Sequence, residues 1–171
     1  MATEKNQNLS IIGSTEYVEI AGIKNIPAKI DTGADTSSIW ASHIDMNQDG
    51  TLKFVLFAEK SPFYTGKTIK TQKYLAKSVR SSIGEKQIRY RVKLPIKIGN
   101  KTLETTFTLS NRSRNNFPIL IGRHTLEGNF LVDVSRSSVP RSSREISKRL
   151  NQELKANPYE FHRKYIKKGA K

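Results

Sequence analysis

The sequence predicts an all-β fold in the form of a small closed barrel, because short apolar segments follow one another with close turns between them. The clearest segment is 90–98, in which apolar residues alternate with charged residues and a proline. This period of two is typical of a strand with one buried face. Gly99 and Asn100 then supply a two-residue turn signal, and the alternation resumes over 103–109, which predicts an antiparallel return.

The other strands are expected where a short apolar run is bounded by glycine or polar turn residues. Residues 1–13 lack this pattern and are expected to form a frayed leader. Residues 36–38 are expected to cap a short helical or irregular turn, with Ile39 and Trp40 buried behind it. The expected strands are 17–20, 26–30, 52–58, 74–79, 87–91 running into 90–98, 103–109 and 130–134, with a loop at 59–68 and a short helix at 124–127.

The C-terminal segment differs from the rest of the chain in its periodicity. A Ser-x-x-Glu capping box at 142–145 precedes apolar residues at every fourth position. This pattern predicts one amphipathic helix over 143–156, which ends before Pro158. We therefore expect two parts, a domain over 14–138 and a basic, helical C-terminal extension over 139–171.

Composition limits the possible classes of protein. A chain of 171 residues suits one domain, or a smaller domain with a tail. The absence of cysteine excludes disulfides and thiolate metal sites. No segment reaches the run of about 18 apolar residues that a membrane span needs, so a cytoplasmic protein without a membrane partner is expected.

The net charge is +15, and residues 136–171 carry 11 of the 30 basic side chains but only 3 of the 15 acidic ones. Such an excess of positive charge favours polyanionic partners. Nucleic acid, a ribosome surface and an acidic peptide all fit this description, and charge alone does not choose among them.

The strand at 26–30 runs directly into Asp31-Thr32-Gly33. A strand that ends in this way can hold a carboxylate on a tight turn at the floor of a cleft, and glycine lets another chain or a substrate come close. An Asx-turn that merely ends a strand explains the same three residues. The tripeptide alone does not decide between these alternatives.

A second motif follows at Phe117-Pro118-Ile119-Leu120-Ile121-Gly122-Arg123. The order of the two motifs resembles that of the retropepsins, which are single-domain aspartic proteases. The resemblance implies that Asp31 is catalytic and that Arg123 pairs with Asp35 behind the active-site loop. The supporting residues of that loop would be Thr32, Gly33, Ala34, Asp35, Gly122 and Arg123.

The chain also resembles a narrower bacterial family, RimB-like and often labelled "ATP-dependent zinc protease", whose members occur beside RimK-type glutamate ligases. Those ligases add glutamates to the C-terminus of a small-subunit ribosomal protein. The resemblance covers roughly residues 15–138, and Asp35 departs from it because the family more often has a basic residue there. It rests on Asp31-Thr32-Gly33-Ala34 with Thr36-Ser37, Arg80-Ser81-Ser82 with Gly84, residues 106–112, residues 117–123, and Gly128 with residues 130–133.

A hairpin is expected over 72–91, between the two motifs, where retropepsins carry the flap that closes over the substrate. Arg89 and Arg91 add to its positive charge. An ordinary surface hairpin is the alternative interpretation. The residues assigned to substrate binding at its tip are Arg80, Ser81, Ser82, Ile83 and Gly84.

The family label suggests zinc and ATP, but the residues favour neither cofactor. The chain has no His-Glu-x-x-His, and His43, His124 and His162 lie far apart in the sequence. It also has no Gly-x-x-x-x-Gly-Lys-Ser/Thr loop for nucleotide phosphates. We expect no metal site and no cofactor.

An aspartic peptidase needs two carboxylates that share one proton, whereas this chain has a single Asp-Thr-Gly. Asp45, Asp49 and Asp133 lack the Thr-Gly context of a second catalytic acid. We therefore expect a homodimer in which the two copies of Asp31 meet. The expected activity is that of an aspartic endopeptidase, with a glutamylated or otherwise acidic protein tail as one candidate substrate. The alternative is a non-catalytic module of retropepsin fold that binds an acidic peptide or ribosomal RNA. Contact with a ribosome or RNA would be made by the basic C-terminal tail.

Overall fold

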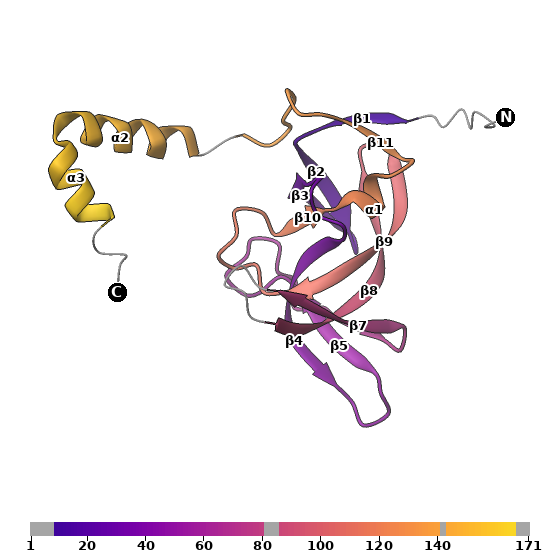
Figure 1. The fold of residues 1–171 in the computed structure, drawn as a ribbon. Helices are drawn as coiled ribbons and strands as arrows, with labels where there is room; N and C mark the ends of the chain where they lie inside the picture. Colours follow the sequence, from indigo (N-terminus) through magenta and orange to yellow (C-terminus); the bar gives the residue numbers. More distant parts are fainter. Residues whose placement is uncertain (1–8, 81–85, 141–142, 167–171) are drawn as a thin grey trace. The chain divides into compact units, whose positions relative to one another are not determined.

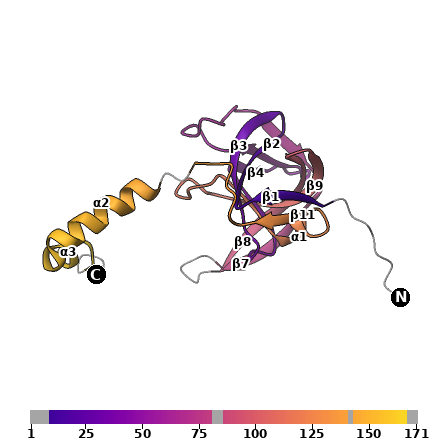
Figure 2. The same cartoon turned by 90° about the horizontal axis from the view of Figure 1, so that it is seen from above.

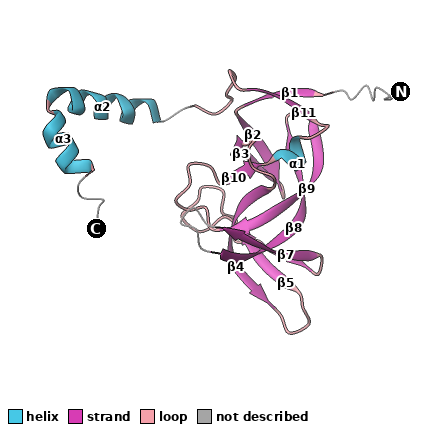
Figure 3. Cartoon of the chain, viewed as in Figure 1, coloured by secondary structure: helices cyan, strands magenta, loops and turns pink. Residues whose placement is uncertain are grey.

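The computed structural model describes residues 9–80, 86–140 and 143–166, which belong to two compact units, Met1–Val139 and Pro140–Lys171. The first unit consists almost entirely of strands (Figures 1 and 3). Its elements are β1 (Ser10–Gly13), β2 (Thr15–Ile20), β3 (Ile23–Ile30), β4 (Ser37–Met46), β5 (Leu52–Leu56), β6 (Thr68–Thr71), β7 (Tyr74–Arg80), β8 (Lys86–Ile98), β9 (Lys101–Ser110), β10 (Ile119–Ile121), the helix α1 (Arg123–Leu126) and β11 (Phe130–Asp133).

Strand pairing closes the sheet into a barrel. The order β10-β3-β2-β8-β9-β4 returns to its start because β10 pairs in parallel with β3 and antiparallel with β4. Ile119 of β10 is thus opposite both Ala28 of β3 and Ile39 of β4. This arrangement confirms the small closed all-β barrel and the short helix after the Gly-Arg motif that the sequence predicts.

The barrel interior is filled by the inward-facing residues of these strands. On β8, Val92, Ile96 and Ile98 are buried while Lys93 and Lys97 are exposed, as the period of two requires. Large side chains from several strands complete the core, and each contributes about 1.5–3 kcal/mol on burial. The largest fully buried ones include Phe54, Phe57 and Phe107.

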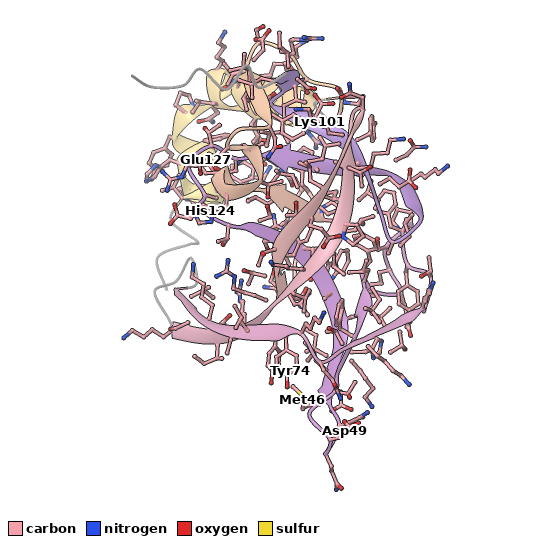
Figure 4. The ribbon with its side chains drawn as sticks, turned by 90° about the vertical axis from the view of Figure 1, so that its right-hand side faces the viewer. Met46, Asp49, Tyr74, Lys101, His124 and Glu127 are labelled. Carbon is pink, nitrogen blue, oxygen red and sulfur yellow. The ribbon has the colours of Figure 1, made fainter. Side chains whose placement is uncertain are left out.

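Two structures extend from the barrel wall. Strands β5 and β6 continue the sheet beyond β4, and β7 pairs antiparallel with β8 to form the expected hairpin, with Arg80 opposite Lys86. Tyr74 anchors the base of this hairpin. Its hydroxyl donates to the carbonyl of Gly50 at 2.8 Å and lies 3.4 Å from Met46 Sδ. Figure 4 shows Tyr74 next to Met46.

The N-terminal prediction was wrong over residues 10–13. This segment forms β1, which pairs in parallel with β11 so that Ser10 is opposite Phe130 and Gly13 is opposite Asp133. Viewed from above, the two strands run side by side with α1 next to them (Figure 2). A four-residue strand whose partner lies at the far end of the domain leaves no local signal in the sequence.

The region after the active-site loop also differs from expectation. Residues 36–38 form no helical turn, because Ser37 begins β4, a ten-residue strand in which Ser37 is opposite Phe107 of β9. Ile39 is fully buried, as expected, whereas Trp40 is only partly buried against the core. The predicted loop at 59–68 ends where β6 begins, at Thr68.

The second unit contains two helices, α2 (Ser143–Ala156) and α3 (Pro158–Tyr165). The predicted helix over 143–156 corresponds to α2, while α3 was not predicted. Pro158 ends α2 and at the same time begins α3, and Asn157 caps α3 by accepting from the backbone N–H of Glu160 at 3.1 Å. Among the residues that the structure describes, no helix is long and apolar enough to cross a membrane.

Replacing Tyr74 by Phe should lower the free energy of unfolding by about 1 kcal/mol, because the half-buried Gly50 carbonyl loses its hydroxyl donor. Chemical denaturation of the purified protein measures the change. Tyr17→Phe is the matched control, because Tyr17 is largely exposed on β2. An equal effect of the two substitutions would contradict the anchoring role of Tyr74.

Candidate active site

Asp31 lies immediately after β3, where the barrel strand ends. Its backbone N–H donates to the Ile121 carbonyl at 2.9 Å, so the residue is still held by β10. One carboxylate oxygen, Oδ1, accepts from the backbone N–H of Gly33 at 3.1 Å, while Oδ2 is 3.8 Å from Lys29 Nζ. The Asx-turn and the accessible acid are therefore both present, because the side chain remains 28% exposed.

The loop after Asp31 is held by backbone hydrogen bonds to the second motif. The N–H of Arg123 donates to the Ala34 carbonyl at 2.7 Å, and the N–H of His124 donates to the Asp35 carbonyl at 3.1 Å. These bonds use the backbone N–H groups at the start of α1, which have no partner within the helix. The two motifs predicted from sequence are thus brought into direct contact.

Gly122 is required by the closeness of this contact. A Cβ atom at this position would lie 2.6 Å from the backbone carbon of Thr36 and 2.8 Å from the carbonyl oxygens of Ala34 and Thr36. No side chain fits into that space. Glycine is therefore the residue that lets the two segments meet.

Gly33 is different. Its backbone is not in the left-handed region, and a Cβ atom there would meet only Asp31 Oδ1, at 3.4 Å. Within the described part of this chain, neither conformation nor packing demands glycine at position 33. A requirement for glycine there would have to come from a substrate or from a second copy of the chain.

Ser37 connects the loop to α1 from inside the protein. Its hydroxyl accepts from the backbone N–H of Gly122 at 3.1 Å and hydrogen-bonds with the hydroxyl of Thr125 at 2.8 Å. Both hydroxyl-bearing residues are buried. A buried N–H left without an acceptor would cost about 1–3 kcal/mol, so Ser37 stabilises the contact between the motifs.

The ion pair between Asp35 and Arg123 is present, as the retropepsin resemblance implies. The two side chains are 59% and 58% exposed. Exposed ion pairs contribute about 0–1 kcal/mol. Within one chain, the backbone hydrogen bonds and the close approach at Gly122 therefore hold the loop more firmly than the ion pair does.

Thr32 is exposed and lines an open pocket of about 660 Å³ together with Arg123, His124 and Leu131. The other sequence-predicted residues lie on the hairpin. Arg80 ends β7, and the assigned tip residues Ser81, Ser82, Ile83 and Gly84 lie outside the described residues.

Arg112 was not assigned to the site from sequence, although it belongs to one of the motifs that carry the family resemblance. It lies in the loop after β9, where its Nε donates to the Phe117 carbonyl at 3.0 Å and one terminal nitrogen is 3.5 Å from Ser38 Oγ. Burial lowers the pKa of the Arg112 guanidinium, the positive charge of Arg89 lowers it further, and the Asp31 carboxylate opposes both effects. The negative charge of Asp31 therefore offsets part of the cost of burying the Arg112 guanidinium.

The other aspartates considered as partners serve local structure. Lys53 hydrogen-bonds to Asp45 and lowers its pKa, with the two side chains 3.2 Å apart. The pKa values of Asp49 and Asp133 are lowered mainly by hydrogen bonds from Thr51 and Ser135, respectively. Each carboxylate is already used in its own turn or strand pair.

No group of three or more potential metal-ligating side chains occurs among the residues that the structure describes. His124 lies on α1, and Glu127, which is labelled with it in Figure 4, caps the C-terminal end of this helix. His43 is on β4 and His162 is on α3, in the other unit. The described part of the chain therefore offers no ready zinc site.

Comparison with known proteins identifies the family. The profile described as "Retropepsin-like aspartic endopeptidase RimB" matches residues 11–143. The chain belongs to the RimB-like family. The matched segment contains both motifs and every described contact of the loop that follows Asp31.

Two curated relatives of this RimB-like chain are each named "Probable alpha-L-glutamate ligase". The protein from Desulfotalea psychrophila is 32% identical over 113 residues, which cover 63% of this chain and 24% of the relative. The protein from Shewanella pealeana is 32% identical over 138 residues, which cover 77% of this chain and 30% of the relative. This chain therefore corresponds to less than a third of either relative.

A solved structure supports the fold. The crystal structure of a Legionella pneumophila protein of unknown function matches with a TM-score of 0.55 and 27% identity, covering 75% of this chain and 95% of that one. The RimB-like barrel is thus similar to an experimentally determined fold.

The two glycines of the site make a matched pair for mutagenesis. Gly122→Ala should lower the free energy of unfolding by about 1–3 kcal/mol or more, because its Cβ would overlap backbone atoms that cannot move aside independently. Gly33→Ala should change it by less than about 0.5 kcal/mol. Thermal and chemical denaturation of both variants test this, and equal destabilisation would contradict the difference in packing.

Proposed function

We propose that this chain is one subunit of a homodimeric aspartic endopeptidase in which Asp31 of each copy supplies one catalytic carboxylate. The observation that carries the proposal is the placement of Asp31. Its partly exposed carboxylate ends a barrel strand and precedes a loop that is tied to the Gly-Arg motif. The family match adds support, since the family is one of retropepsin-like aspartic endopeptidases.

The chemistry follows from two carboxylates brought within a few ångströms of each other. Like charges at that separation cannot both ionise readily, so the catalytically competent pair is the one that shares a single proton. The ionised carboxylate takes a proton from a water molecule, which attacks the scissile carbonyl carbon. The protonated carboxylate donates to the carbonyl oxygen. Apparent pKa values measured for such a pair belong to both acids together.

A second copy is required because the chain has one Asp-Thr-Gly and its other candidate aspartates are occupied locally. The surface beside the active-site loop is suited to that copy. Ile11 of β1 and Leu131 of β11 are opposite each other and are 57% and 54% exposed. Leu131 also lines the pocket that contains Thr32, so this apolar pair is continuous with the loop that must meet its counterpart.

The substrate we propose is a glutamylated protein tail, and the enzyme would trim it in the cytoplasm. The relatives named as probable glutamate ligases contain a segment similar to this chain, which links the fold to glutamate transfer. The net charge of +15 would increase the encounter rate with an acidic tail in a salt-dependent manner. Neither ATP nor a metal ion takes part in the proposed reaction, so a chelator should leave activity unchanged.

Asp31→Asn should abolish peptide cleavage and leave the fold intact, since the amide preserves the shape of the side chain but cannot act as a base. Cleavage of glutamate-ended peptides, followed by mass spectrometry, measures activity, and circular dichroism checks the fold. Asp45→Asn is the control, because Asp45 pairs with Lys53 away from the loop. Cleavage by Asp31→Asn would exclude the aspartic mechanism.

The mass of the protein in solution should be that of a dimer, and Leu131→Glu should convert it to a monomer by placing a charge in the apolar contact. Light scattering coupled to gel filtration measures both at low and moderate salt. Leu75→Glu is the control, since Leu75 is equally apolar and 66% exposed but lies on β7. A monomer at every salt concentration would favour a module that binds acidic peptide or RNA without cleaving it.

A further inference from the structure

Lysine and arginine side chains from several segments lie on the side of the barrel that carries the candidate catalytic acid. Lys29 and Asp31 lie two positions apart at the end of β3, with Nζ 3.8 Å from Oδ2. Arg112 approaches from the loop after β9 and is affected by the charge of Asp31. Arg89 of β8 in turn affects Arg112. Hydrogen bonds connect the two arginines: Arg112 lies 3.5 Å from the hydroxyl of Ser38, which hydrogen-bonds at 2.8 Å with the hydroxyl of Ser110, and Ser110 lines the same pocket as Arg89.

Arg112 has capacity to bind a further anion. It has five N–H donors, of which Nε is used by the Phe117 carbonyl and one terminal nitrogen is 3.5 Å from Ser38 Oγ. The carbonyl fixes the guanidinium from one side and leaves donors of its terminal nitrogens free of these two partners. An arginine held in this way binds a carboxylate with little loss of side-chain entropy.

Arg89 lines a pocket of about 610 Å³, which opens where β8 separates from the end of β9. Gln87 accepts a hydrogen bond from Arg89 at 2.9 Å and so orients its guanidinium. Arg114, Ser110 and Asn111 add further hydrogen-bonding groups to the same pocket. None of the described residues that line it is acidic.

Within the described ranges, Arg89, Arg112 and Arg114 form no ion pair with an aspartate or a glutamate. Arg89 and Arg112 repel each other, and because both are half-buried, water screens this repulsion only in part. An anionic ligand offsets this repulsion, and a planar carboxylate matches the donor geometry of a guanidinium.

We propose that Arg112 and Arg89 form a carboxylate-binding subsite, which positions an acidic group of the peptide next to the bond that faces Asp31. This inference rests on the proposed peptidase function and deepens it by assigning specificity to two residues. A carboxylate could come from a glutamate side chain or from the free C-terminus of the peptide. Both sources present the same chemistry to the two guanidinium groups.

Measuring peptide binding to an inactive variant tests the subsite independently of catalysis. The full-length Asp31→Asn chain is titrated with fluorescent peptides that end in four glutamates, in four glutamines, or in four glutamates with an amidated C-terminus. The glutamate peptide should bind about ten- to hundredfold more tightly than the glutamine peptide, as expected for a charge-assisted hydrogen bond. Loss of affinity on amidation would identify the C-terminus as the ligand, and retained affinity would identify the side chain.

Arg89→Gln and Arg112→Gln, each added to Asp31→Asn, should reduce the preference for glutamate to within a few-fold, while Arg89→Lys should retain part of it. Arg89→Gln keeps the proposal testable if loss of the Phe117 contact unfolds the Arg112 variant. Lys24→Gln is the control for net charge. Lys24 is exposed at the opposite end of β3 from Asp31 and should leave the preference unchanged.

The subsite would be overturned if both arginine variants kept the preference for the glutamate peptide. It would also be overturned if Lys24→Gln reduced that preference as much as the arginine variants do. Equal binding of the glutamate and glutamine peptides by Asp31→Asn would overturn it as well. These outcomes differ from a failure of the proposed function. If the unsubstituted chain cleaves neither peptide but the Arg89-dependent preference is present, the subsite stands and the peptidase assignment fails. If the unsubstituted chain cleaves the glutamate and glutamine peptides equally, the peptidase assignment stands and the subsite fails.

Discussion

The close approach of Gly122 to the backbone at residues 34–36 is the constraint on which the site depends. Gly122 and Ser37 are 85 positions apart in the sequence, yet the hydroxyl of Ser37 accepts the N–H of Gly122. Any side chain at 122 would separate the loop from α1 and remove the two backbone bonds that fix Ala34 and Asp35. The barrel brings these segments together because β10 fills the gap between β3 and β4.

Different residues hold the active-site loop in place and present the acid to solvent. Gly122, Ser37 and Thr125 are buried and make the loop rigid, whereas Asp31 and Thr32 remain accessible at its start. The exposed ion pair of Asp35 with Arg123 contributes little within one chain. A rigid loop that presents one acid is well prepared to meet an identical loop, since the geometry of a shared-proton pair allows little error. The single Asp-Thr-Gly of the chain and the apolar pair of Ile11 and Leu131 thus have a common explanation in the proposed dimer.

Charge acts at two levels in this protein. The overall excess of positive charge works over long distances and is weakened by salt. Arg89 and Arg112 act at short range, because both are half-buried and screening by salt is weaker there. The overall charge would attract an acidic peptide to the protein, and Arg89 and Arg112 would determine which carboxylate of that peptide is bound. The basic helical unit contributes to the first level, because many of its charged side chains are exposed.

The sequence by itself determined the barrel, the loop motif and the identity of the candidate acid, because period-two alternation and an Asp-Thr-Gly turn are local patterns. It also indicated the pairing of Asp35 with Arg123 through a family resemblance. Only the tertiary structure showed that residues 10–13 are a strand, that Ser37 starts β4, and that the Phe117 carbonyl holds Arg112 beside Ser38. It likewise separated Gly122, which packing requires, from Gly33, which packing within one chain does not. These features arise from contacts between distant segments, which local sequence patterns do not encode.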